Sequence, residues 1–153
     1  MTEVPTSCGV LVLATTGEIL LGHSTGGRHW DIFKGLQEPD ETVRVTALRE
    51  LREESGLTPQ STDLMDLGRF DYLPRKELHL FAMTSDRLAI SSLNCTSTFV
   101  DRFGRRRPGM DAFDWMLFDQ VPQRCGKGMT RVLTTLLLTV VLTNVRGSDV
   151  ADL

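Results

Sequence analysis

Three glutamates in the middle of the chain are spaced so that they share one face of a helix. Glu50, Glu53 and Glu54 stand at positions i, i+3 and i+4, which are neighbours on a helical surface. Like charges this close repel each other unless a cation lies between them, and hard divalent cations prefer carboxylate oxygens. The spacing predicts a metal site. The alternative is a solvated helix face with ordinary ion pairs.

The helix that carries these carboxylates is predicted over residues 43–54. This segment is rich in Arg, Glu, Leu and Ala, which favour a helix, and it has no Gly or Pro, which disfavour one. Pro39-Asp40 predicts the helix start, with acidic residues in the first turn, and Gly56 predicts its end. An apolar stripe at helical spacing would face the core: Val43, Ala47, Leu48 and Leu51.

The glutamates belong to a longer motif from Gly35 to Leu57, GLQEPDETVRVTALRELREESGL. It resembles the box of the Nudix hydrolase family, Gly-x5-Glu-x7-Arg-Glu-U-x-Glu-Glu-x-Gly-U with U aliphatic, at every specified position. A solvated helix face would not explain Glu41, Arg49 and the two glycines at these offsets. The resemblance implies cleavage of a nucleoside diphosphate linked to another group, with Mg²⁺ or Mn²⁺ as cofactor.

The resemblance also implies roles for individual residues of this motif. Glu50, Glu53 and Glu54 would hold the metal together with the backbone carbonyl of Gly35, and the same three glutamates would be catalytic. Arg49 completes the catalytic set, and with Glu41 it would tie the loop to the helix.

Two residues outside the motif are predicted to bind substrate. Lys34 ends Trp30-Asp31-Ile32-Phe33-Lys34-Gly35, which resembles the Trp-x-x-Pro-Lys-Gly segment of dinucleoside polyphosphate hydrolases, with Phe33 in place of proline. Lys34 would bind a phosphate as a point charge, or it is simply solvated. Tyr72 stands where such enzymes carry a tyrosine, which would stack on a base, or it is an ordinary half-buried tyrosine of a strand. Pro74 instead resembles a marker of ADP-ribose pyrophosphatases.

The general base is less clearly marked. The segment from Pro108 to Trp115, PGMDAFDW, resembles Pro-Glu-Phe-Asp-Gly-Trp-Arg-Trp of bacterial enzymes that act on dinucleoside polyphosphates or triphosphate RNA ends. Gly109 stands at the glutamate position, which is often a metal ligand or base. Asp111 is the nearest carboxylate and the predicted substitute. Otherwise a glutamate of the box must act as the base.

A basic loop precedes this segment. Arg105 is predicted to contact extended phosphates or an RNA end, and the alternative is a solvated turn that offsets the acidic site. Its arginine neighbours are Arg102, Arg106 and Arg107.

The whole chain has the length of one domain. Its 153 residues predict a single domain over 1–153, with a core at about 8–138 and a tail at 139–153. Hydrophobic residues make up 41% and the net charge is −3, which does not favour bulk nucleic-acid binding. Three separated cysteines favour a reducing compartment. We expect a cytoplasmic protein without signal peptide or membrane span, as a monomer or homodimer.

Strand patterns dominate, with two helices. Strands are predicted at 8–14, 18–22, 29–34, 64–72, 77–84 and 113–118, and a second long helix at 127–138. The pattern alone indicates an α+β fold. The resemblance implies the Nudix fold, a mixed sheet between helices with a loop-helix-loop active site. Trp30 and Trp115 are predicted to lie in the core.

The favoured function is magnesium-dependent hydrolysis of a pyrophosphate bond in a dinucleoside polyphosphate. Alternatives with the same chemistry are ADP-ribose or another nucleotide sugar, an oxidised nucleoside triphosphate, or an RNA 5′ end. An alternative of another class is a nucleotide-binding sensor on a Nudix scaffold without catalysis. The intact box favours an enzyme, and the glycine at position 109 is the feature that favours the sensor.

Overall fold

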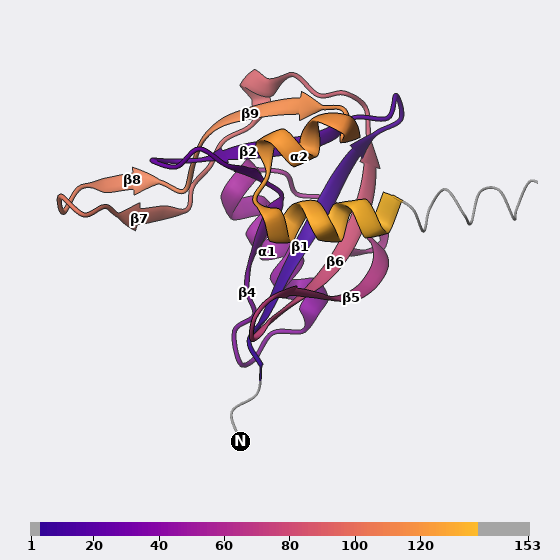
Figure 1. Ribbon diagram of the computed structural model, residues 1–153, viewed down its shortest axis with the longest axis horizontal. Coiled ribbons are helices and arrows are strands. Elements are labelled where there is room, and N and C mark those ends of the chain that lie inside the picture. Colours follow the sequence, from indigo (N-terminus) through magenta and orange to yellow (C-terminus); the bar gives the residue numbers. More distant parts are fainter. Residues whose placement is uncertain (1–3, 138–153) are drawn as a thin grey trace, which may run out of the picture.

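The computed structural model describes residues 4–137. A mixed sheet runs in the order β3-β2-β1-β6-β5, β4 pairs with β1, and β9 pairs with β2 (Figure 1). A separate two-stranded sheet is formed by β7 and β8. The strands are β1 (Thr6–Ala14), β2 (Ile19–Ser24), β3 (Trp30–Asp31), β4 (Phe33–Leu36), β5 (Met65–Leu73), β6 (Lys76–Ser85), β7 (Thr98–Val100), β8 (Arg106–Pro108) and β9 (Met110–Met116).

Helices cover the sheet. They are α1 (Val43–Ser55), the short α2 (Val121–Arg124), and the helix at 127–137, which continues to the end of the described residues. Three single turns of 3-10 helix lie in the connections, namely η1 (Ser61–Asp63), η2 (Ile90–Ser92) and η3 (Phe118–Gln120). Figure 1 shows α1 and the helix at 127–137 on opposite sides of β1.

Strand β1 is the centre of the fold because it pairs with three strands. It runs parallel to β6 and antiparallel to β2 and β4. A parallel pair needs a crossover connection, and the chain supplies it through α1. Side chains of β1 alternate between two apolar clusters: Val10 packs with Leu51 of α1, whereas Leu11 packs with Leu133 of the opposite helix. The predicted α+β fold is confirmed.

The predicted helix at 43–54 is confirmed, but the residues expected to begin it, Pro39-Asp40, do not do so. The N-cap is Thr42, whose hydroxyl accepts a hydrogen bond from the Val45 N–H (3.2 Å), and the first turn holds no acidic residue. A side-chain acceptor at this position satisfies a free N–H of the first turn, so Pro39-Asp40 lies before the helix. Gly56 ends the helix in the left-handed conformation (φ 82°), as expected.

The single strand predicted at 29–34 is two short strands. β3 pairs with β2, and β4 pairs with β1. Ile32 separates the two, and its N–H is bound by the Asp31 side chain (2.8 Å). The sequence pattern could not show that consecutive residues take different partner strands. The hairpin of β7 and β8 was also missed, because each strand has three residues and no alternating pattern to detect.

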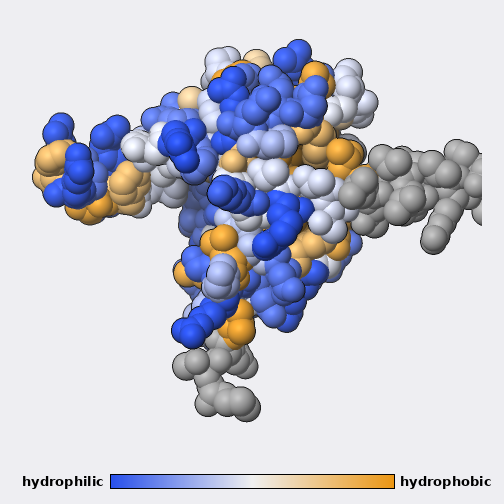
Figure 2. Space-filling model, in the orientation of Figure 1, coloured by the Kyte–Doolittle hydropathy of each residue, from blue (hydrophilic) through white to orange (hydrophobic). Residues whose placement is uncertain are grey.

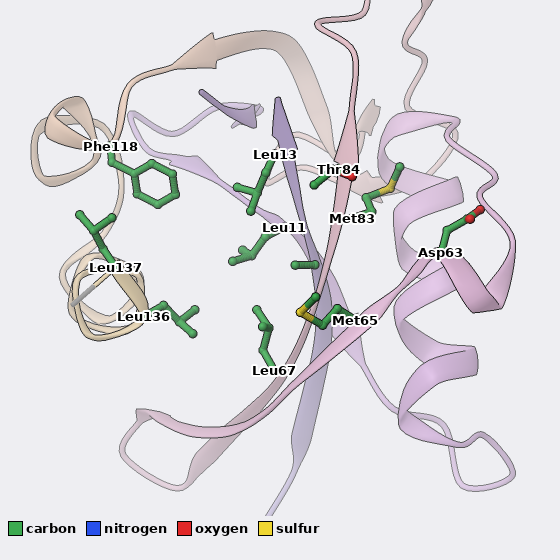
Figure 3. A pocket seen from close by; sticks show the side chains of 11 residues that line it. Leu11, Leu13, Asp63, Met65, Leu67, Met83, Thr84, Phe118, Leu136 and Leu137 are labelled. Carbon is green, nitrogen blue, oxygen red and sulfur yellow. The ribbon is translucent and has the colours of Figure 1, made fainter. Parts of the chain in front are cut away.

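A cavity of about 320 Å³ lies between the sheet and the helix at 127–137 (Figure 3). Apolar side chains from β1, β5 and the helix point into it, and Asp63 and Thr84 are the polar residues at its margin. Its lining is Leu11, Leu13, Asp63, Met65, Leu67, Ala82, Met83, Thr84, Phe118, Leu136 and Leu137. An apolar lining does not suit a charged phosphate chain, which is the ligand that the sequence motif implies.

Within residues 4–137, no helix is long and apolar enough to cross a membrane. The predicted tail at 139–153 lies outside the described residues, as does Leu138 at the predicted end of the second helix.

The cap at Thr42 gives a stability test. Thr42→Ala removes the acceptor for the Val45 N–H and should lower the free energy of unfolding by about 1 kcal/mol. The control is Asp40→Asn at the predicted but incorrect start, where a surface change should stay within about 0.5 kcal/mol. Urea unfolding of both variants measures the difference. An equal loss in the two variants would contradict the observed cap.

Candidate active site

The Arg49 guanidinium lies between three carboxylates. Its Nε and Nη2 donate to the two oxygens of Glu41 (2.7 and 2.8 Å), and its Nη1 donates to Glu50 (2.8 Å) and Glu53 (3.3 Å). Nη2 also reaches the Leu36 carbonyl (3.2 Å). Two parallel bonds to one carboxylate fix the geometry of both groups. This arrangement ties the loop before α1 to the helix, as the resemblance implies.

Glu41 receives two further hydrogen bonds, from the Thr46 hydroxyl (3.0 Å) and the Glu38 N–H (3.1 Å). These donors favour the charged form of the carboxylate. The bonds from Arg49, above all, lower the pKa of Glu41 to about 2. Glu41 is therefore ionised in the folded protein at neutral pH.

The Glu50 carboxylate of α1 lies directly against Gly35 of strand β4. A Cβ added to Gly35 would meet the Glu50 carboxylate, with its Cδ 2.1 Å away. The Glu50 side chain is 14% exposed, and burial raises its pKa. The glycine that opens the motif thus leaves room for the Glu50 carboxylate beside the strand backbone.

Glu54 lies beside the next residue of the same strand. Its Oε1 accepts a hydrogen bond from the Lys34 N–H (3.1 Å). Burial, opposed in part by the Lys34 charge, raises the pKa of Glu54 to about 8. A carboxyl group in this state gains much from a bound cation, because a nearby positive charge favours its ionised form.

The donor set of this face suits a hard divalent cation. It consists of carboxylates, and Glu50 and Glu54 are both held at raised pKa by burial. Among residues 4–137, however, no three carboxylate, imidazole or thiolate groups already converge as metal ligands. The reason is visible in the contacts: Arg49 holds Glu50 and Glu53, and a backbone N–H holds Glu54. Metal binding must turn these carboxylates toward the ion.

Two of the three predicted substrate residues, Lys34 and Tyr72, lie together. The Lys34 ammonium is 5.6 Å from the centre of the Tyr72 ring and forms an ion pair with Asp31 (2.9 Å). Burial opposes the charge on Lys34, but Asp31, Tyr72 and Glu54 together outweigh burial and raise the pKa of the lysine. Lys34 is therefore a charged, half-buried group rather than the freely solvated lysine of the alternative.

Tyr72 faces a cavity of about 380 Å³. The cavity walls come from the loop before β3, the end of β5 and the start of the helix at 127–137, and they include His29, Trp30 and Lys127. Gly128 lets this helix approach, because a Cβ there would lie 3.0 Å from the Tyr72 carbonyl oxygen. Trp30, predicted as core, is half-buried and lines this cavity, whereas Trp115 is buried as predicted.

Phe33 replaces the proline of related segments, and it fills the core. Its side chain is fully buried, and its ring centre lies 6.1 Å from that of Phe113. Phe33 and Gly35 face α1, whereas Lys34 between them faces Tyr72, which follows the alternation of a strand. A large apolar residue at 33 thus helps to fix the direction of Lys34.

Asp111 pairs with a histidine. Its carboxylate lies 2.6 Å from Nδ1 of His23. The His23 ring makes an edge contact with the Trp30 ring, with 5.3 Å between the ring centres. Among the described contacts, none joins Asp111 to the glutamates of α1. At the position of the missing glutamate, a Cβ on Gly109 would lie 2.7 Å from the Ser97 hydroxyl. The base role of Asp111 stays a prediction.

Arg105 lies on a projecting arm formed by β7, β8 and their turn, residues 98–108 (Figure 1). Figure 2 shows hydrophilic and hydrophobic residues side by side at the end of this arm. Among the described residues, Arg105 contacts Phe103 and Asp101 of the arm, whereas Lys34 contacts Tyr72.

Comparison with known proteins identifies the same family as the sequence motif. The NUDIX domain model matches residues 4–135. The chain is 25% identical over 118 residues to the RNA pyrophosphohydrolase of Marinomonas sp. (strain MWYL1), covering 72% of this chain and 73% of the relative. An Ap4A hydrolase from C. elegans, solved as a binary complex, has a TM-score of 0.66 at 15% identity, with 90% of this chain and 98% of that chain covered.

A third similar protein is bifunctional. The NMN adenylyltransferase/ADP ribose pyrophosphatase of Francisella tularensis, solved with AMP and a Mn ion, has a TM-score of 0.68 at 18% identity. The match covers 91% of this chain but only 42% of that longer chain. At these identities the structural likenesses establish the fold alone.

The Glu41–Arg49 pair gives a test with a defined pH dependence. Because the pKa of Glu41 is lowered to about 2 on folding, its charge stabilises the native state above its ordinary pKa, which is about 4.3. That stability is lost as pH falls from about 4.5 toward 2. Glu41→Gln should therefore be less stable than the native chain at pH 7, and the gap should narrow at pH 3. Urea unfolding measures both, and a constant gap would refute the pair's contribution.

Proposed function

This chain belongs to the NUDIX domain family, and from that premise we propose that it is a divalent-metal-dependent pyrophosphohydrolase whose favoured substrate is a dinucleoside polyphosphate. The observation that carries the substrate choice is the contact between Lys34 and Tyr72 (5.6 Å) next to Glu54. A phosphate contact and a stacking face thus adjoin the acidic helix. A substrate with a nucleoside on each side of its phosphates uses all three.

The acidic face of α1 would hold the metal. Glu50, Glu53 and Glu54 supply the carboxylates, with the Gly35 carbonyl as a further ligand. When bound, Mg²⁺ or Mn²⁺ would neutralise charge on the diphosphate and lower the pKa of an attacking water. A nucleotide complex with manganese in the Francisella neighbour supports this choice of cofactor.

The remaining steps belong to side chains of this chain. Arg49 positions Glu50 and Glu53 through Nη1 and keeps the loop on the helix through Glu41. Lys34 carries a full charge toward the phosphates, and its half-buried position reduces screening by salt. Tyr72 and Trp30 offer aromatic faces to a base, which gains affinity by stacking.

One observation disfavours the ADP-ribose alternative. Pro74, which resembles the marker of that subfamily, lies in the exposed turn between β5 and β6 and lines a different cavity with Arg75 and Arg131. It does not face the cavity of Tyr72. Activity on an RNA 5′ end has support of another kind, from the name of the Marinomonas relative. Turnover is therefore measured on a panel of substrates: a dinucleoside tetraphosphate, ADP-ribose, an oxidised nucleoside triphosphate and triphosphate RNA.

The first test is metal-dependent turnover. Glu53→Gln keeps size but removes a carboxylate charge, and it should lower kcat by at least about a hundredfold with Mg²⁺ or Mn²⁺, since such charges act most in the transition state. Arg52→Gln is the matched control, because Arg52 is an exposed neighbour on α1 and its loss should leave turnover unchanged. Phosphate products are identified for each substrate of the panel.

The same assay tests the base. A loss in Asp111→Asn as large as that in Glu53→Gln would support Asp111 in this role, and a near-normal rate would assign it to a glutamate of α1. Full activity of Glu53→Gln at saturating metal would overturn the proposed site. No turnover of any substrate by the native protein would favour the nucleotide-binding sensor.

The second test is substrate choice. Tyr72→Ala should raise KM for a dinucleoside tetraphosphate by about five- to a hundredfold, if stacking on a base contributes about 1–3 kcal/mol. Turnover should change little, because stacking far from the reacting bond acts equally on ground and transition states. Tyr72→Phe keeps the ring and should stay near the native value. The melting temperature of each variant excludes a packing defect. An unchanged KM in a folded Tyr72→Ala variant would remove the main support for the dinucleotide.

A further inference from the structure

The arm at residues 98–108 carries charge and aromatic surface that the proposed hydrolysis does not use. It holds four arginines and one aspartate in a chain whose net charge is −3. It also projects from the sheet, so that its side chains are reached from several sides (Figure 1). A basic patch on an otherwise acidic protein indicates an anionic partner.

The aspartate of the arm does not neutralise the arginines. Its Oδ1 accepts hydrogen bonds from the Phe103 and Arg105 N–H groups (both 2.9 Å). The contact of its Oδ2 with Arg107 Nη1 is long, at 3.8 Å. Asp101 therefore shapes the turn, and one carboxylate against four guanidinium groups leaves the arm with net positive charge. Arg106 Nη1 also donates to the Thr98 hydroxyl (2.9 Å).

An exposed aromatic ring lies among these arginines. Phe103 is 65% exposed, with the guanidinium carbons of Arg102 and Arg105 at 4.9 and 5.5 Å from its ring centre. Phe99 and Val100 on β7 are also exposed. Exposed apolar side chains gathered in one place typically mark an interaction site, and two of the four arginines, Arg102 and Arg105, lie near the Phe103 ring at cation–π distance.

The arm faces a hollow rather than open solvent on one side. A cavity of about 580 Å³ lies between the arm and the loop at Thr25 and Gly26. Its walls include Phe99, Phe103 and three of the arginines, Arg102, Arg105 and Arg107. Such a hollow can hold an extended chain that passes along the arm.

The base of the arm is joined to the acidic helix. The Thr96 and Ser97 N–H groups both donate to the Glu53 carbonyl (2.7 and 3.0 Å), and the Gly109 N–H donates to the Ser97 carbonyl (2.9 Å). The residues before the arm are thus bonded to α1 at Glu53, and the residue after the arm is bonded to Ser97. A ligand on the arm would run from the neighbourhood of the proposed metal site outward.

We propose that this arm is a binding surface for single-stranded nucleic acid. A strand offers phosphates for the guanidinium groups and unpaired bases for Phe103, and affinity for single strands comes from this combination of charge and stacking. Inorganic polyphosphate would use the arginines but leave Phe103 exposed. An apolar peptide would use Phe103 and Phe99 but leave the arginines without partners. The proposal does not depend on hydrolysis, since the strand need not be cleaved.

The test is fluorescence anisotropy with a labelled 12-nucleotide single strand that ends in a 5′ hydroxyl, in EDTA, so that no pyrophosphate bond or metal is involved. Binding by the full chain is expected to weaken about five- to a hundredfold in Phe103→Ala. Phe103→Leu, which stays apolar but lacks the ring, should weaken it similarly, and Phe103→Tyr should preserve it. Arg87→Gln, an exposed arginine outside the arm, is the control.

A second measurement separates stacking from charge. For single strands, log K falls with log[salt] with a slope of about −0.7 for each phosphate contact. The double variant Arg102→Gln and Arg107→Gln should therefore make the slope shallower by about 1.4, whereas Phe103→Ala should leave the slope unchanged. Melting temperatures show whether each variant is folded, and turnover of a dinucleoside tetraphosphate by Phe103→Ala should match the native chain.

Several results would overturn the proposal. One is the absence of strand binding at millimolar protein. A second is binding that remains intact in both Phe103→Ala and Phe103→Leu. A third is displacement of the labelled strand by inorganic tripolyphosphate as effectively as by the unlabelled strand. Either result would indicate charge attraction alone. Tighter binding of an acidic peptide, or a concentration-dependent dimer lost in Phe103→Ala, would assign the arm to a protein partner. None of these results bears on the metal-dependent turnover, which fails or succeeds separately.

Discussion

The backbone of β4 packs against the carboxylates of two glutamates on α1. Glu50 lies against Gly35, and Glu54 accepts a hydrogen bond from the Lys34 N–H. This contact buries two carboxylates on the face of the helix that also carries Glu53, and burial raises the pKa of both. Buried carboxylates cost stability unless positive charge compensates them. Arg49 supplies part of that charge within the chain, and a divalent cation suits the rest.

The same strand connects the acidic helix to the cavity of Tyr72. Residues of a strand alternate between its faces, so Phe33 and Gly35 face α1 and Lys34 faces the aromatic ring. A four-residue strand therefore places the charge of Lys34, proposed to bind phosphate, within one residue of the contact with the proposed metal-binding glutamates. Small shifts of β4 would change both sites together, which is why its packing, through the buried Phe33, matters for function.

The segment at 94–97 links the helix to the arm. Its N–H groups bind carbonyls at the end of α1, from Glu53 and Ser55, and Ser97 lies where a side chain at position 109 would stand. A side chain at 109 would require the Ser97 hydroxyl to shift. The glycine allows the close contact at the base of the arm, where the Gly109 N–H donates to the Ser97 carbonyl. The acidic site and the basic arm consequently share one structural support, with opposite charges at its two ends.

The sequence by itself determined the features that depend on local spacing. The helix and its glutamates, the closing Gly56, the first hairpin and the paired β5 and β6 all follow from periodicity and turn residues, which act between near neighbours. The family motif added the partnership of Glu41 and Arg49. The strand split at Ile32 and the arm were not predictable, because short strands are defined by their partners rather than by a pattern of their own.

Only the tertiary structure decided which distant residues meet. Lys34 and Tyr72 were predicted separately, and the structure puts them in contact through the pairing of β4 with β1 and the approach of the helix at Gly128. It paired Asp111 with His23 and brought Trp30 to the cavity of Tyr72. Such contacts depend on strand order and on close packing across many residues. Neither is encoded by the spacing of residues along the chain.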